Sequence, residues 1–388
     1  MVMFGFTITM KLSLGHYSQQ AAPPGYQGAP RGARIDGWPP PSAVAIAPGT
    51  RPVDAPILAS RTPTIRLGWL PALSLTSALG ILLLAFAYTG ARMTPLGGPA
   101  PWWPDPLFWC ALLTLLTPIA VRLIATGASR LERVALVGML GEGLYLVKVL
   151  RSPLAFELHD EFLHYRTVDD ILRSGRLFGY NPLLPISALF PGLETLTSAL
   201  ASISGLSIFA AGIIVGAVAR LTLVLALYLV YERVSASTRA AGIATLLYMI
   251  NPKLLFFDAQ FSYESLALPF AVLVLLALVY RAHAQPDDGE RLGLTLVALL
   301  GLGALVITHH LTSYAFVLLL VLWTVVYYTL SLRRRRVGGG NVRERVSPAG
   351  MALLGLVLSL SWAVYVAPIV VGYLLPHLQA GVHHWCLD

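Results

Sequence analysis

The sequence predicts an all-α, polytopic membrane protein with about nine transmembrane helices. Of its 388 residues, 56% are hydrophobic and only 12% are charged, whereas soluble domains carry about 25% charged residues. Apolar runs long enough to cross a bilayer recur along the chain, and basic residues gather between alternate runs. These observations exclude a typical cytosolic enzyme and a nucleic-acid-binding module, because so apolar a chain cannot build a polar exterior.

Residues 1–66 differ from the rest of the chain because they are rich in proline. Ten prolines lie between Ala21 and Arg66, mixed with glycine, alanine and arginine. Such a segment cannot bury enough apolar surface to offset its ordering entropy. We therefore expect a disordered cytosolic tail over residues 1–66 and a polytopic transmembrane domain over residues 67–388. The preference for arginine over lysine indicates a GC-rich bacterial genome.

Nine apolar stretches of about 17–25 residues are candidate membrane spans. They cover residues 67–89, 105–124, 133–150, 206–231, 241–257, 265–281, 292–308, 312–331 and 351–374. The seventh and eighth stretches are separated only by His309, His310 and Leu311, so they require a tight hairpin.

Basic residues indicate how these spans are oriented. With the N-terminus in the cytosol, 19 lysine and arginine residues fall in cytosolic segments and seven fall outside. The cluster Arg333–Arg336 then lies in the last cytosolic loop. This predicts a multi-pass protein of the cell membrane with an extracytoplasmic C-terminus. The sequence runs only to Asp388 after the last span, which fits either a short natural tail or a truncated gene product.

One long polar segment, residues 151–205, interrupts the spans and is expected outside the cytosol. Its first part is rich in charge, and its apolar residues recur at helical spacing, which predicts an amphipathic helix on the membrane surface. Prolines then interrupt the chain. Residues 192–202 predict a second short interfacial helix, in which Glu194 faces either a cavity or the interface.

Candidate catalytic residues lie in the first predicted helix of this loop. Asp160 and Glu161 are adjacent carboxylates that can act as a general base on an acceptor hydroxyl or hold a divalent cation. His159 and His164 are candidates for substrate binding, and His164 shares a helical face with Asp160. Arg166 can bind a phosphate through its guanidinium. The alternative is a solvated helix whose charges keep it out of the bilayer.

Two further polar junctions fall on the same side of the predicted membrane. One carries Asp258 and Glu264, and the other carries His309 and His310 in the hairpin. Ionisable groups at membrane depth are costly and suggest function, so these four residues are candidates for binding a substrate or its phosphate. Adjacent histidines can also complete a metal site with carboxylates. The alternative is a hairpin tip that simply reaches water.

The stretch from Leu131 to Tyr314 carries the motif His159-Asp160-Glu161 in an extracytoplasmic loop between surface helices, and it resembles the GT-C superfamily of integral-membrane glycosyltransferases. The resemblance implies transfer of a sugar from a polyprenyl-phosphate lipid to a cell-envelope glycan or lipid acceptor outside the cytosol. It implies a base or metal-binding role for Asp160 or Glu161, and a divalent metal ion is compatible with this chemistry but not required. Two features depart from the family pattern, because the acidic loop follows the third predicted span instead of the first, and because many members carry further spans or an extracytoplasmic C-terminal domain that this sequence is not expected to form.

Two other classes compete with this enzyme. A polytopic transporter or lipid flippase would also hold buried charges, but such proteins often contain inverted repeats, and no convincing repeat relates the two halves of this sequence. A non-catalytic, truncated membrane protein is the third interpretation. The expected partners are the membrane, the donor lipid and the acceptor, without nucleic acid.

Overall fold

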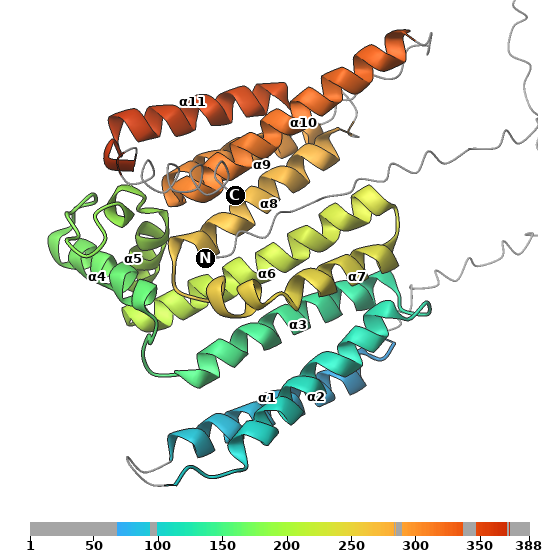
Figure 1. Cartoon of the computed structure of the whole chain (residues 1–388), viewed down its shortest axis with the longest axis vertical. Coiled ribbons are helices and arrows are strands. Elements are labelled where there is room, and N and C mark those ends of the chain that lie inside the picture. The colour runs from blue at the N-terminus through green and yellow to red at the C-terminus, as the bar shows by residue number, and fades with distance from the viewer. Residues whose placement is uncertain are drawn as a thin grey trace, which may run out of the picture. The chain divides into compact units, whose positions relative to one another are not determined.

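The computed structural model describes residues 68–93, 99–282, 284, 289–336, 347–370 and 372 (Figure 1). Within these ranges the chain forms helices and contains no β-strand, which confirms the all-α fold class. These residues belong to one unit of the chain, Thr64–Asp388. The predicted disordered tail over residues 1–66 and the end of the last predicted span lie outside the described residues.

Eleven α-helices and two short helical turns make up the described part of the chain. The α-helices are α1 (Leu70–Arg92), α2 (Pro104–Ile124), α3 (Arg130–Arg151), α4 (His159–Ser174), α5 (Gly192–Ser204), α6 (Ile208–Ser235), α7 (Thr238–Met249), α8 (Tyr263–Arg281), α9 (Gly289–Thr308), α10 (His310–Arg336) and α11 (Ala349–Tyr365). The turns are the 3₁₀ turn η1 (Ser187–Leu189) and the π-helical turn η2 (Lys253–Phe257).

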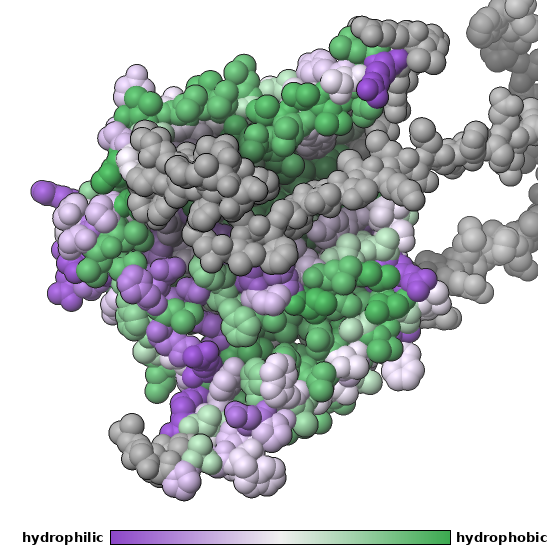
Figure 2. All heavy atoms as spheres, in the orientation of Figure 1, coloured by the Kyte–Doolittle hydropathy of each residue, from purple (hydrophilic) through white to green (hydrophobic). Residues whose placement is uncertain are grey.

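Six of these helices are long and apolar enough to cross a membrane: α1, α2, α6, α8, α9 and α10. By the length and composition of its helices, the chain is a multi-pass membrane protein. Exposed leucine, valine and aromatic side chains cover the outer sides of several helices (Figure 2). Such surfaces suit contact with lipid acyl chains.

The nine predicted spans are not confirmed, because the helices in three of the predicted stretches are not both long enough and apolar enough to cross a membrane. α3 has the length to cross, but it carries Glu142 and Lys148 in its second half and further charges at both ends. α7 has only 12 residues and ends at Met249, well short of the end of the predicted span 241–257, and α11 has 17 residues where 351–374 was expected.

The prediction of one continuous helix over 241–257 is wrong. α7 ends at Met249, and the chain continues through η2 and an irregular segment to α8. Pro252 explains the break, because proline lacks a backbone donor and disfavours the helical conformation of the residue before it. The side chain of that residue, Asn251, instead accepts a hydrogen bond from the backbone amide of Lys253 at 2.9 Å.

The two largest apolar cores among the described residues join most of the helices. One core joins α2, α3, α6 and α7, with α1 packed against α2 and α3. The other joins α8, α9, α10 and α11. The long helix α6 packs against α8 and connects the two cores. The two cores are thus joined through α6, and most of the candidate site residues lie at the helix ends and beside the break after α7.

The helices α4 and α5 pack together at one end of this bundle, which we call the α4–α5 end (Figure 1). α5 also contacts α6, α8 and α9. Through these contacts the loop over residues 151–205 is a packed part of the fold, with α4 and α5 as its two helices.

At the opposite end of the bundle, an arginine at the start of α3 pairs with a glutamate of α6, where Arg130 Nε lies 2.7 Å from Glu232 Oε1.

Candidate functional site

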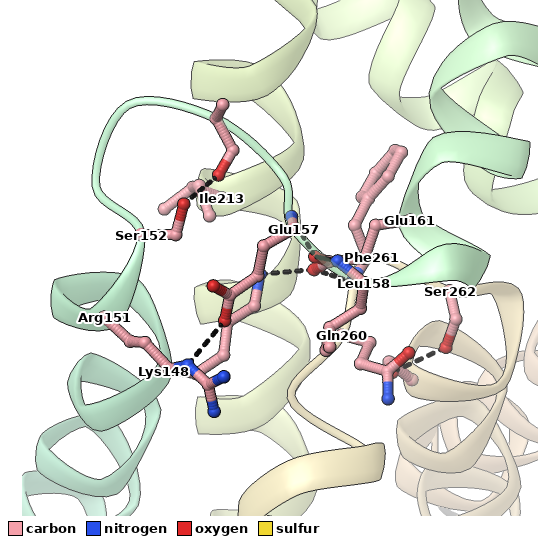
Figure 3. Close-up of polar contacts among 12 residues, drawn as sticks. Lys148, Arg151, Ser152, Glu157, Leu158, Glu161, Ile213, Gln260, Phe261 and Ser262 are labelled. Atoms are coloured by element: carbon pink, nitrogen blue, oxygen red, sulfur yellow. Dashed lines mark hydrogen bonds and ion pairs between the residues drawn. The ribbon is translucent and has the colours of Figure 1, made fainter. Parts of the chain in front are cut away.

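Glu161 anchors the start of α4 to the bundle (Figure 3). Its side chain is fully buried and forms an ion pair with Lys148 of α3. One carboxylate oxygen also accepts the backbone N–H of Phe261 at 3.0 Å, and the other accepts the N–H groups of Glu157 and Leu158 at 3.2 Å each. The carboxylate therefore joins α3, the first turn of α4 and the segment before α8.

These contacts indicate that Glu161 stabilises the fold. Both of its oxygens are occupied by donors from the chain, and none of its surface reaches solvent. A general base has to reach the proton that it removes, and Glu161 does not reach the surface in this arrangement. The two adjacent candidate carboxylates therefore differ in accessibility, because Glu161 is buried and Asp160 is partly exposed.

Asp160 lies in the first turn of α4 with 44% of its side chain exposed. Its Oδ1 is 3.5 Å from Nδ1 of His159, whose side chain is 84% exposed. The first turn of a helix favours negative charge, since unpaired backbone N–H groups point toward it. Asp160 is therefore an accessible carboxylate, held in place by its buried neighbour Glu161.

His164 does not share a site with Asp160, contrary to the expectation from their spacing. Its ring is fully buried, and Nδ1 lies 2.6 Å from Oε1 of Glu194 on α5, which is also fully buried. The pair fastens α4 to α5 one turn beyond Glu161. Because Glu194 is fully buried, it does not face the membrane interface, and its carboxylate holds His164.

The histidine pair of the α9–α10 connection is buried at the same end, so the alternative of a hairpin tip that reaches water is wrong. The ring of Tyr263 lies between His164 and His309, with centroid distances of 4.6 and 4.2 Å. The rings of His309 and His310 are 5.0 Å apart. Burial, together with His310 and His164, lowers the pKa of His309 far below its usual range, so this imidazole is neutral at neutral pH.

Arg166 lies on the exposed side of α4, where its Nε is 3.7 Å from Oδ2 of Asp170. One turn further, Arg173 pairs with Asp169 at 2.8 Å. Both are pairs of residues four apart on a helix surface, which contribute little to stability. Arg166 remains free to exchange Asp170 for another anion, and its phosphate-binding role stays a prediction.

Asp258 and Glu264 lie near the break after α7 but do not contact each other through a hydrogen bond. Glu264 pairs with Lys253 at 2.8 Å. Burial, and after it the charge of Glu264, raise the pKa of the half-buried Asp258 to about 6. Sequence reasoning missed one member of this region, Arg220 of α6, although a lone charge inside an apolar span was the signal that could have found it.

The candidate residues therefore form two groups. The buried group comprises Glu161, His164, His309 and His310, and the accessible group comprises His159, Asp160, Arg166 and the pair of Glu264 with Lys253, while the half-buried Asp258 lies between the two in exposure. Within the described ranges, no cluster of three or more His, Cys, Asp or Glu side chains is arranged to hold a metal ion. Asp160 and Glu161, the two predicted ligands, do not form such a cluster.

Comparison with known proteins adds no relative: no family model matches the chain, and no curated protein or solved structure matches it either.

Proposed function

We propose that the chain is a membrane glycosyltransferase that moves a sugar from a polyprenyl-phosphate lipid to a hydroxyl group of a cell-envelope acceptor at the α4–α5 end. The observation that carries the proposal is the division of roles between Glu161 and Asp160. A buried, fully bonded carboxylate fixes the helix start, and the next carboxylate is exposed at the end of an apolar bundle. A reaction between a membrane lipid and a polar acceptor needs a base at that level.

In the proposed reaction, Asp160 takes the proton of the acceptor hydroxyl. The acceptor oxygen forms a bond to the anomeric carbon of the sugar, and the bond from that carbon to the lipid phosphate oxygen breaks. The electron pair leaves with the lipid phosphate, whose charge a guanidinium such as Arg166 stabilises. The buried histidines do not take part in these steps and serve to hold α4 and α5 against the bundle.

The experiment compares two partly exposed aspartates of α4. The chain is reconstituted in proteoliposomes with labelled polyprenyl-phosphate mannose and polyprenyl-phosphate glucose as donors and an envelope extract as acceptor. Asp160→Asn should reduce transfer of label by at least about 100-fold, the usual contribution of a general base. Asp169→Asn is the control, because its side chain is 32% exposed against 44% for Asp160 and its partner Arg173 takes no part in the proposed steps, and it should retain activity. Equal activity of the two variants excludes Asp160 as the base.

A second candidate function is transport, and one observation favours it. The helix expected over residues 241–257 is interrupted after α7, and ionisable side chains lie beside this break. Both features occur at substrate sites of transporters. The same proteoliposomes separate the two functions. Movement of the donor lipid or its sugar across the bilayer without transfer to an acceptor supports transport, and transfer that depends on Asp160 supports the glycosyltransferase.

A further inference from the structure

Arg220 places a guanidinium near the middle of the apolar helix α6. The residue is only 3% exposed. Its Nη2 donates a hydrogen bond to the backbone carbonyl of Leu254 in η2 at 2.6 Å, so the arginine satisfies one peptide group at the break after α7. Its Nε and Nη1 are buried, and no described residue accepts a hydrogen bond from them.

Two carboxylates lie near this guanidinium without bonding to it. Glu142 of α3 and Asp258, which follows η2, both interact with Arg220 through their charge. In the part of the chain that the structure describes, neither comes within the 4.0 Å of an ion pair with Arg220. Each carries a buried oxygen, Oε1 of Glu142 and Oδ1 of Asp258, to which no described group donates.

Donors and acceptors that face the same interior without a direct bond indicate water between them. A buried polar group without a partner is costly, and one buried water makes about two to four hydrogen bonds to such groups. Arg220 supplies the donors, and the two carboxylates supply the acceptors. Ordered water between these side chains would satisfy all of them.

The charges around Asp258 leave one negative charge uncompensated. Lys253 and Glu264 also act on Asp258, but they pair with each other and cancel. Arg220 can compensate one carboxylate, so either Glu142 or Asp258 remains in excess.

The other titratable groups near Arg220 are Tyr145 and Tyr248. The hydroxyl of Tyr145 donates to the carbonyl of Ile213 at 3.1 Å, and burial gives neither tyrosine a reason to ionise. They add no charge to the site.

We infer that Glu142, Arg220 and Asp258 form a hydrated site that binds one exchangeable proton on one of its two carboxylates. With the proton bound, the site holds one guanidinium, one carboxylate and one carboxylic acid, and it is neutral, which the interior of the bundle favours. The site lies beside the break after α7, and this position supports the inference, since helix breaks and buried ionisable groups mark proton and ion sites in membrane proteins. The inference uses none of the residues of the proposed sugar transfer.

Infrared difference spectroscopy of the full chain in lipid nanodiscs tests this inference. A carboxylic acid has its own C=O stretching band, which shifts in heavy water and disappears when the proton leaves. We expect one such band in the wild type, which disappears as the pH rises, because burial raises the pKa of Asp258 above its usual range. Both Glu142→Gln and Asp258→Asn should remove it, because each removes the excess charge and leaves the other carboxylate ionised beside Arg220. Asp170→Asn, which changes an exposed carboxylate of α4, is the control and should retain the band.

The inference is overturned if the wild type shows no titrating band, or if the band persists in either Glu142→Gln or Asp258→Asn. Size-exclusion chromatography and circular dichroism identify variants that fold. The titration of the wild type needs no substitution, so a variant that fails to fold still leaves a decisive measurement.

Discussion

The buried ion pair of Lys148 and Glu161 allows a quantitative test of how α4 is held. Their side chains are 7% and 0% exposed. Lys148→Met removes the ammonium and keeps an unbranched side chain, so the carboxylate of Glu161 stays buried without its counter-charge. Loss of one partner from a buried pair costs about 3–5 kcal/mol. Because three backbone N–H groups still donate to Glu161, we expect the lower end, about 3 kcal/mol.

A double-mutant cycle measures the interaction itself. Lys148→Met, Glu161→Gln and the double variant are unfolded thermally in lipid nanodiscs. Each single variant should lose about 3 kcal/mol, and the double variant should lose less than the sum, with a coupling of about 2 kcal/mol or more. The matched cycle is Lys253→Met with Glu264→Gln, another Lys–Glu pair whose side chains are 58% and 23% exposed. Its coupling should stay below about 1 kcal/mol.

Two results would refute this reasoning. Additive losses in the cycle of Lys148 and Glu161 would mean that the two charges do not stabilise each other. Equal coupling in both cycles would mean that burial is not the reason for the strength of the first pair.

Three further predictions concern other parts of the structure. Gly192→Ala should destabilise the fold by about 1–3 kcal/mol, because the added Cβ would lie 2.9 Å from the Cα of Thr308, whereas Gly303→Ala meets no atom within 4 Å and should be neutral in the same thermal unfolding assay. Glu194→Ala leaves its histidine partner buried without its hydrogen bond and should cost about 1–3 kcal/mol; an unchanged midpoint would contradict that pairing. Asp258 has a higher pKa in the folded chain, about 6, than its ordinary 3.8, so the folded state binds the proton more tightly and stability should rise by up to about 3 kcal/mol as pH falls from about 6 to 4. Asp258→Asn should abolish this part of the pH dependence, and an unaltered profile would contradict it.

The pattern of apolar residues predicted the helices well, because a helix buried in a bilayer or a bundle is apolar along most of its length. Each of the nine expected spans meets a helix of the structure, and the two expected helices of the loop correspond to α4 and α5. The break after α7 was missed for the opposite reason. Its local signal, Asn251-Pro252, is two residues long and was outweighed by the apolar residues on both sides.

The partners of the charged residues could not be predicted, because they come from distant parts of the chain. Glu161 meets Lys148 of α3 and the backbone of Phe261 before α8. His164 meets Glu194, 30 residues away. Spacing within one helix indicated which residues share a face, but it could not tell which face the bundle would cover.

Helix geometry explains why the fates of Asp160 and Glu161 differ. Successive residues of an α-helix point about 100° apart, so a helix that turns one of two adjacent carboxylates into the bundle can leave the other at the edge of its buried face, as it does here with Asp160. Lys148 and the backbone N–H of Phe261 decide that Glu161 is the inner one, and the exposure of Asp160 follows from that choice. Loss of the anchor should therefore reduce both stability and sugar transfer, whereas Asp160→Asn should reduce transfer and leave the unfolding midpoint unchanged. If Glu161→Gln and Asp160→Asn behaved alike in both the unfolding assay and the sugar-transfer assay, the two carboxylates would share one role.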